Sequence, residues 1–149
     1  MSKRRDRRMM GRAFQLARLN QGLTGKNPSV GCILVDPAGH IVGAGVTGTG
    51  GRPHAEEIAL EEAAGKAKGG TAYVTLEPCR ERSSGAASCS RKLVDAGIAR
   101  VVVAIEDPHP TARDGLAILR EGGVRVETGL GKHAAARLYR WFFAASQEH

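Results

Sequence analysis

The stretch TAYVTLEPCRERSSGAASC, residues 71–89, decides the fold. It opens with a β-rich apolar run over residues 71–76, breaks at Pro78, and carries Cys79 and Cys89. Threonine, tyrosine and valine favour strands, whereas proline interrupts a central strand. This pattern predicts a buried strand that ends just before two chemically reactive side chains.

Outward from this stretch, the chain alternates between helical and extended patterns. Helix-forming residues with apolar side chains at helical spacing predict helices over residues 6–20, 53–68, 88–96, 111–121 and 132–145. Runs rich in β-branched residues predict strands over residues 29–35, 40–46, 71–76, 99–105 and 124–127. We interpret Asp6 as the N-cap of the first helix and Cys79 as the start of a helical segment.

The order of these elements predicts an α/β fold. Asp36, Pro37, Ala38 and Gly39 have turn chemistry between the first two strands, so these strands should form an antiparallel hairpin. The later strands alternate with helices, which favours parallel pairing with helices on both faces. We therefore expect residues 1–149 to form a single domain, a three-layer α/β/α sandwich with a mixed five-stranded sheet.

Composition narrows the class of protein. The chain has 149 residues and a formal charge of +7, and it contains no apolar run near the ~20 residues that cross a membrane. The basic N-terminus lacks the apolar core of a secretory signal, so we expect a cytoplasmic protein without membrane contact. Three cysteines, an odd number, favour metal binding or free thiols over disulfides in a reducing compartment.

Two further patterns have more than one interpretation. The N-terminal cations Lys3, Arg4, Arg5, Arg7, Arg8 and Arg12 form a solvated end, attract a phosphorylated small molecule, or bind nucleic acid. The string GAGVTGTGG, residues 43–51, has glycines at spacings seen in dinucleotide sites, but no helix follows at the required distance. We interpret it as a flexible loop beside a pocket.

His54, Cys79 and Cys89 form a candidate zinc site. A catalytic zinc ion takes three protein ligands and keeps one position open, and these residues supply one nitrogen and two sulfurs. Zinc lowers the pKa of a bound water to about 7, so a hydroxide nucleophile is available near neutral pH. Glu56, two residues after His54, is placed to act as a proton shuttle without binding the metal.

Taken singly, these residues have plainer interpretations. A histidine before a helix is commonly a surface or capping group, and a buried cysteine such as Cys32 is commonly packing. The combination is more specific, because H-x-E followed by P-C-x-x-C is the signature of zinc deaminases. Here the second cysteine comes ten residues after the first rather than three.

The wide spacing points to one branch of these enzymes. The chain resembles the deaminase domain of the bifunctional riboflavin biosynthesis deaminase/reductase, in the cytidine-deaminase-like superfamily. The resemblance runs over nearly the whole chain and is carried by NPSVGC at residues 27–32, PHAE at 53–56, YVTLEPC at 73–79, GIARVV at 97–102, DPHP at 107–110 and VETG at 126–129. It implies a cytidine-deaminase-like fold, a zinc cofactor held by His54, Cys79 and Cys89, and Glu56 as the catalytic acid and base.

The resemblance also implies a substrate, 2,5-diamino-6-ribosylamino-4(3H)-pyrimidinone 5′-phosphate, whose 2-amino group is hydrolysed to a carbonyl with release of ammonia. Asn27 offers a donor and an acceptor to the pyrimidine edge, and Arg80 and Arg82 are candidates for the phosphate. Thr47 stands where the family has a histidine, and the loop after Cys79 lacks two histidines that the family has there. The resemblance places both positions on loops that contact the substrate, so these changes concern which substrate is bound.

Other functions stay open at this stage. The chain could deaminate another nucleobase, nucleoside or tRNA base, or it could be a zinc-stabilised binding module without activity. A homodimer or higher homo-oligomer is expected from the resemblance, while nucleic acid is the least favoured partner because aromatic residues are scarce. The sequence stops where the family's reductase domain would follow. Two interpretations stay open: a stand-alone deaminase, for which a separate reductase is a candidate partner, or one domain of a longer protein.

Overall fold

The computed structural model describes residues 2–79, 88–108 and 115–147, with side chains placed up to residue 145. Its strands are β1 (Gly31–Val35), β2 (Ile41–Val46), β3 (Thr71–Val74), β4 (Arg100–Val103) and β5 (Arg125–Thr128). Its helices are α1 (Lys3–Leu19), α2 (Ala55–Ala63), α3 (Cys89–Asp95), α4 (Gly115–Glu121), α5 (Lys132–Leu138) and α6 (Arg140–Gln147), with a short 3-10 helix, η1 (Thr49–Gly51).

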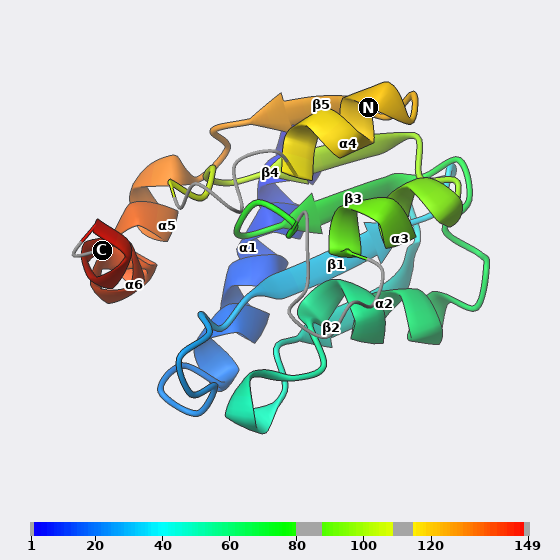
Figure 1. Ribbon diagram of the computed structural model, residues 1–149. Helices are drawn as coiled ribbons and strands as arrows, with labels where there is room; N and C mark the ends of the chain where they lie inside the picture. The colour runs from blue at the N-terminus through cyan, green and yellow to red at the C-terminus, as the bar shows by residue number, and fades with distance from the viewer. Residues whose placement is uncertain (1, 80–87, 109–114, 148–149) are drawn as a thin grey trace.

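The strands form one mixed sheet in the order β2-β1-β3-β4-β5 (Figure 1). β1 is antiparallel to both β2 and β3, whereas β3, β4 and β5 run parallel to one another. The predicted hairpin, the parallel second half and the mixed five-stranded sheet are therefore confirmed. All residues of β4 are buried, as expected for a strand covered on both faces.

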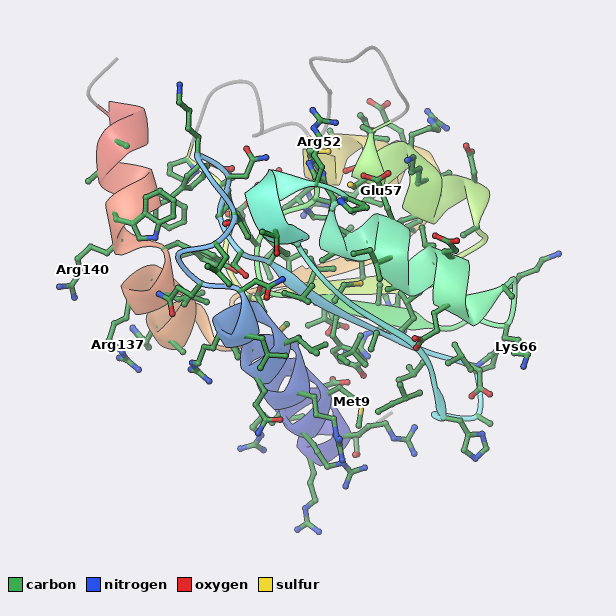
Figure 2. The ribbon with its side chains drawn as sticks, turned by 90° about the horizontal axis from the view of Figure 1, so that it is seen from below. Met9, Arg52, Glu57, Lys66, Arg137 and Arg140 are labelled. Atoms are coloured by element: carbon green, nitrogen blue, oxygen red, sulfur yellow. The ribbon has the colours of Figure 1, made fainter. Side chains whose placement is uncertain are left out.

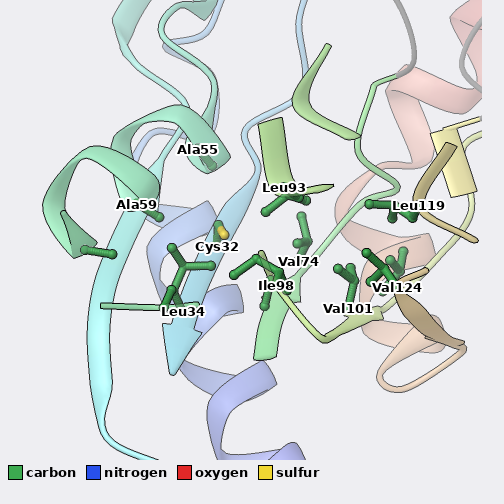
Figure 3. Close-up of a cluster of buried hydrophobic side chains, with 14 of the residues drawn as sticks. Cys32, Leu34, Ala55, Ala59, Val74, Leu93, Ile98, Val101, Leu119 and Val124 are labelled. Carbon is green, nitrogen blue, oxygen red and sulfur yellow. The ribbon is translucent and has the colours of Figure 1, made fainter. Parts of the chain in front are cut away.

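Helices cover both faces of the sheet, because side chains alternate along each strand. Cys32 and Leu34 of β1 point towards α2, α3 and α4, in a core that Figure 3 shows with Val74, Val101, Leu93 and Leu119. Ile33 and Val35 point the other way, towards a second cluster that includes residues of α1 and α5. Cys32 is fully buried in the first cluster, so its interpretation as a packing residue is confirmed.

The glycines of the GAGVTGTGG string have a structural role that differs from our interpretation. Gly43 and Gly45 lie in β2 directly below α2, so this part of the string is strand rather than loop. A Cβ atom at Gly45 would lie 2.2 Å from the carbonyl oxygen of Ala55, and one at Gly43 would lie 2.3 Å from that of Ala59. Glycine therefore allows α2 to pack directly on β2, which fixes the helix that begins just after His54.

The first helix begins earlier than predicted. Ser2 is its N-cap, with the side-chain oxygen accepting a hydrogen bond from the Arg5 amide at 3.0 Å. The prediction of Asp6 as N-cap was wrong, because Asp6 is buried and accepts two hydrogen bonds from the Arg100 guanidinium, at 3.0 and 2.6 Å. Tyr73 donates a third, at 2.6 Å. This contact joins α1 to β3 and β4.

The helix predicted over residues 132–145 is two helices that meet at Tyr139. The buried Tyr139 hydroxyl donates to the Ser29 carbonyl at 2.8 Å and shares a hydrogen bond with the Thr75 hydroxyl at 2.6 Å. These contacts tie the end of α5 to the start of β1 and the end of β3. No helix among the described residues is long and apolar enough to span a bilayer.

Candidate metal centre and active site

His54 is positioned by the start of α2. It is the N-cap residue of this helix, with extended backbone, and its N–H donates to the Glu57 carboxylate at 3.2 Å. Glu57 in turn accepts a hydrogen bond from the Lys92 ammonium on α3, at 2.9 Å. The backbone of the predicted nitrogen ligand is therefore linked to both helices that border the site.

The two cysteines come from segments that are bonded to each other. Cys89 is the first residue of α3, and Ser88 caps this helix. Cys79 lies in the irregular segment after β3, and the residues that would continue a helix from it, 80–87, lie outside the described residues, so its interpretation as a helix start stays a prediction. Its carbonyl accepts a hydrogen bond from the Ser90 amide at 3.2 Å, and its sulfur accepts one from the Cys89 amide at 3.3 Å.

The three predicted ligands meet in one cluster. The nitrogen and sulfur atoms of His54, Cys79 and Cys89 all lie within 4.8 Å of one another. The His54 Nδ1 atom is 3.2 Å from the Cys89 sulfur and 3.8 Å from the Cys79 sulfur. Ordinary zinc bond lengths in a tetrahedral site imply nitrogen–sulfur separations of about 3.6 Å. The donor set and its spacing therefore fit a zinc ion, with one coordination position left for a reactant.

The sulfur atoms are electrostatically prepared for a cation. A hydrogen bond from the Cys89 thiol, aided by His54, lowers the pKa of Cys79 to about 4 despite its partial burial. The same hydrogen bond, together with burial, raises the pKa of Cys89 well above its usual range. Contact between the two thiols therefore favours loss of one proton from the pair, and binding of a metal by both sulfurs requires release of the other proton as well.

Glu56 lies beside the cluster in the first turn of α2 and is only 4% exposed. Its pKa is raised to about 7, chiefly by burial; a backbone hydrogen bond and His54 oppose the rise, and the neighbouring Cys79 adds to it. Among the described residues, no side chain donates a hydrogen bond to the Glu56 carboxylate. A carboxyl group in this setting can both accept and donate a proton near neutral pH.

Two of the four predicted substrate residues are described. The Asn27 side-chain amide donates to the Gly51 carbonyl at 3.1 Å, on the segment that leads to His54. Thr47 is buried, and its hydroxyl accepts a hydrogen bond from the Val30 amide at 2.9 Å. Both contacts hold loops together, so a substrate role for these side chains stays a prediction. Arg80 and Arg82 lie outside the described residues.

The site also contains residues that the sequence patterns did not reveal. Glu57 and Glu77 each accept hydrogen bonds from the backbone near a predicted ligand. For Glu57 a signal existed, because a glutamate three residues after an N-cap is typical of a capping box. Burial raises the pKa of Glu77 to about 7, even though backbone N–H groups of Asp107 and Leu116 favour its charged form.

The basic N-terminal residues lie away from this cluster. Most of them are exposed on α1, which packs on the sheet face opposite to α2 and α3 (Figures 1 and 2). Figure 2 shows long side chains on the outer side of this helix. Met9 of the same helix is buried in the second core cluster, with side chains of the sheet. This arrangement separates the basic residues from the zinc ligands and favours the interpretation of a solvated surface over that of a phosphate attractor at the site.

Comparison with known proteins agrees with this geometry. Residues 3–105 match the family described as the cytidine and deoxycytidylate deaminase zinc-binding region. The "Diaminohydroxyphosphoribosylamino-pyrimidine deaminase" of Buchnera aphidicola subsp. Acyrthosiphon pisum is 41% identical over 135 residues, which are 90% of each chain. The chain belongs to the riboflavin-biosynthesis branch of this zinc-binding deaminase family. The expected family and its zinc-binding His-Cys-Cys cluster are thereby confirmed.

Other members of the riboflavin branch are longer. The Escherichia coli (strain K12) "Riboflavin biosynthesis protein RibD" is 44% identical over 138 residues, which are 92% of this chain but 37% of that protein. A crystal structure of a deaminase/reductase from Thermotoga maritima matches with a TM-score of 0.89 and 30% identity, over 97% of this chain and 42% of that one. The cytidine-deaminase-like fold is therefore confirmed, and this chain spans less than half of these relatives.

Proposed function

We propose that this protein catalyses the zinc-dependent hydrolytic deamination of 2,5-diamino-6-ribosylamino-4(3H)-pyrimidinone 5′-phosphate in riboflavin biosynthesis. The observation that carries the proposal is the close approach of His54, Cys79 and Cys89, all within 4.8 Å, next to the buried carboxyl group of Glu56. The Buchnera relative, matched over 90% of both chains, carries the name of this activity and supports the choice of substrate.

In the proposed mechanism, His54 Nδ1 and the sulfurs of Cys79 and Cys89 would hold the metal. A zinc ion bound there would supply a hydroxide nucleophile near neutral pH, because zinc lowers the pKa of bound water to about 7. A purely structural zinc site usually has four protein ligands and needs no neighbouring acid or base, whereas this site has Glu56 beside three candidate ligands. Three described ligands and a neighbouring glutamate therefore favour catalysis over the alternative of a zinc-stabilised binding module.

Glu56 moves the protons in this proposal. Its carboxylate takes a proton from the attacking water and delivers it to a ring nitrogen as the new C–O bond forms at C2. It then carries the second proton to the exocyclic amine, so that the C–N bond breaks and ammonia leaves. Burial of Glu56 keeps this carboxyl group from being solvated by bulk water, which supports the proposed role.

The substrate contacts and partners are further parts of the proposal. Asn27 and Thr47, on the loops before β1 and after β2, would border the pyrimidine, and Arg80 and Arg82 would meet the phosphate. We also expect a homodimer or higher homo-oligomer, a separate reductase that uses the product, and a cytoplasmic location. Light scattering on the zinc-loaded protein measures its molar mass and so tests the expected homo-oligomer.

The experiment that tests the proposal measures ammonia release from the aminopyrimidine phosphate, alongside cytidine, dCMP, guanine and unmodified tRNA. We expect turnover of the aminopyrimidine phosphate alone. Turnover of one of the other substrates, with none of the riboflavin intermediate, would replace the substrate assignment by that of another deaminase. Full zinc occupancy without turnover of any of them would favour the binding module.

A further inference from the structure

Glu77 is a buried carboxylate that lies two residues before the predicted zinc ligand Cys79. It is 5% exposed, at the end of the segment that follows β3. One carboxylate oxygen accepts a hydrogen bond from the Asp107 amide at 3.0 Å, and the other accepts one from the Leu116 amide at 3.4 Å. Its own N–H donates to the Ile105 carbonyl at 3.0 Å. One residue thus joins the ends of β3 and β4 and the first turn of α4.

The turn that follows Glu77 is contacted by two helices. The Ser90 hydroxyl of α3 donates to the Pro78 carbonyl at 3.2 Å. Gly115 of α4 packs directly against the same carbonyl, where a Cβ atom would lie only 2.1 Å from the oxygen. Because Leu116 follows Gly115 and is bound by Glu77, the carboxylate fixes the helix end that presses on this turn.

We propose that Glu77 is a positioning residue for the metal centre: its carboxylate clamps α4 and the end of β4 onto the Pro78–Cys79 turn, and thereby sets the Cys79 sulfur at bonding distance from a zinc ion shared with His54 and Cys89. This inference rests on the proposed zinc site. It goes beyond the three ligands, because Glu77 does not bind the metal but would affect how tightly the metal is held. Residues that orient ligands typically contribute about 10- to 100-fold to metal affinity.

The chemistry of the contact requires two acceptor oxygens. Both partners are backbone N–H groups, so a carboxylate satisfies them with one oxygen each. Glutamine has the same shape but presents an NH₂ group to one of the two donors, which breaks that hydrogen bond. Aspartate keeps the charge but is one methylene shorter and cannot reach both amides. The two variants therefore loosen the clamp by different means.

The test compares zinc release from the wild type, Glu77→Gln, Glu77→Asp and the control Glu121→Gln. Glu121 is exposed at the last residue of α4, so its substitution makes the same chemical change outside the clamp. Each protein is loaded with zinc and mixed with excess EDTA, and the released metal is followed with a chromogenic indicator. Far-UV circular dichroism and the thermal midpoint, with and without zinc, report the fold. Cobalt(II) substitution reports ligand geometry through its absorption spectrum.

We expect both Glu77 variants to release zinc about 10- to 100-fold faster than the wild type, with a changed cobalt spectrum and a smaller rise in thermal midpoint on zinc binding. The Glu121→Gln protein should match the wild type. Folded Glu77 variants that release zinc at the wild-type rate would overturn the inference, even if their midpoints fell equally with and without metal. If Glu77→Gln fails to fold, Glu77→Asp decides by the same readouts. Failure of the wild type to hold zinc would instead overturn the metal site itself.

Discussion

The amide of Cys89 donates a hydrogen bond to the sulfur of Cys79, at 3.3 Å. One predicted zinc ligand therefore orients another through the first peptide unit of α3, so the site is partly assembled before a metal arrives. The ten-residue spacing between these cysteines is bridged by this contact and by the Ser90 amide on the Cys79 carbonyl.

Replacing Cys79 by serine should remove zinc. A serine hydroxyl is not a zinc ligand at neutral pH, and two remaining protein ligands do not make a stable zinc site. We expect zinc content, measured by atomic emission, to fall from about one per chain to below about 0.1, with loss of deaminase activity. The control is Cys32→Ala, which removes a fully buried thiol outside the cluster and should keep its zinc. Equal zinc content in both variants would contradict the ligand assignment.

Replacing Glu56 by glutamine should separate catalysis from metal binding. The amide keeps the shape of the side chain but can no longer carry protons, and general acid–base groups contribute about 10² to 10⁴ in rate. We expect kcat to fall by at least about 10²-fold while zinc content stays at the wild-type level. Glu61→Gln, an exposed position on the same helix, should leave both unchanged. Full activity in the Glu56 variant would refute the proton-shuttle role.

The Asp6–Arg100 pair should be a major contributor to stability. Asp6→Asn weakens two hydrogen bonds to a buried guanidinium and one to Tyr73, and disruption of a buried ion pair costs about 3 kcal/mol. The thermal midpoint should fall by about 10 °C. Asp95→Asn, at an exposed position at the end of α3, should change stability by less than about 0.5 kcal/mol. Similar midpoints for the two variants would show that the pair contributes little.

The same pair should make stability depend on pH. Arg100 holds the pKa values of Asp6 and Glu127 below their ordinary values of 3.8 and 4.5. A carboxyl group with a lowered folded-state pKa stabilises the protein fully above its unfolded-state pKa, and this contribution is lost as the pH falls through the folded-state pKa. Urea unfolding of the wild type and Asp6→Asn should therefore differ most above about pH 5. The difference in unfolding free energy should shrink below pH 3.8. A difference that stays constant from pH 6 to pH 3 would contradict the lowered pKa of Asp6.

Gly45→Ala should disturb the helix that starts after His54. The added methyl group would lie 2.2 Å from the Ala55 carbonyl, so α2 must move away from β2, and overpacking of this kind costs about 1–3 kcal/mol. Gly11→Ala is the matched control, because nothing lies within 4 Å of a Cβ atom there and alanine favours an exposed helix. Denaturant midpoints should fall for the first variant and stay the same or rise for the second.

Much of the fold is encoded in local patterns, and those predictions were confirmed. The apolar run of β4 and the turn residues between β1 and β2 depend only on neighbours in sequence. Two of the failures depend on distant contacts. Asp6 has the residue type of an N-cap, but in the folded protein it binds Arg100, which is 94 residues away in sequence. The last helix divides at Tyr139, whose hydroxyl forms hydrogen bonds with Ser29 and Thr75.

The candidate site shows the same division. The cluster of His54, Cys79 and Cys89 was predicted from the sequence, because zinc chemistry restricts which side chains can serve and short motifs place them. The same motif predicts Glu56 as the proton shuttle, and that role stays a prediction. Glu77 was missed as a functional candidate, since its partners are backbone amides of Asp107 and Leu116 that no side-chain pattern reveals. The roles of Asn27 and Thr47 stay predictions, because their described contacts are to backbone atoms.

The most direct measurement is ammonia release from 2,5-diamino-6-ribosylamino-4(3H)-pyrimidinone 5′-phosphate by the wild-type protein, with zinc content determined on the same preparation. We predict one equivalent of ammonia per substrate consumed, at about one zinc per chain, with activity lost on chelation and restored by added zinc. Zinc-loaded protein that leaves this substrate unchanged would contradict the proposed function.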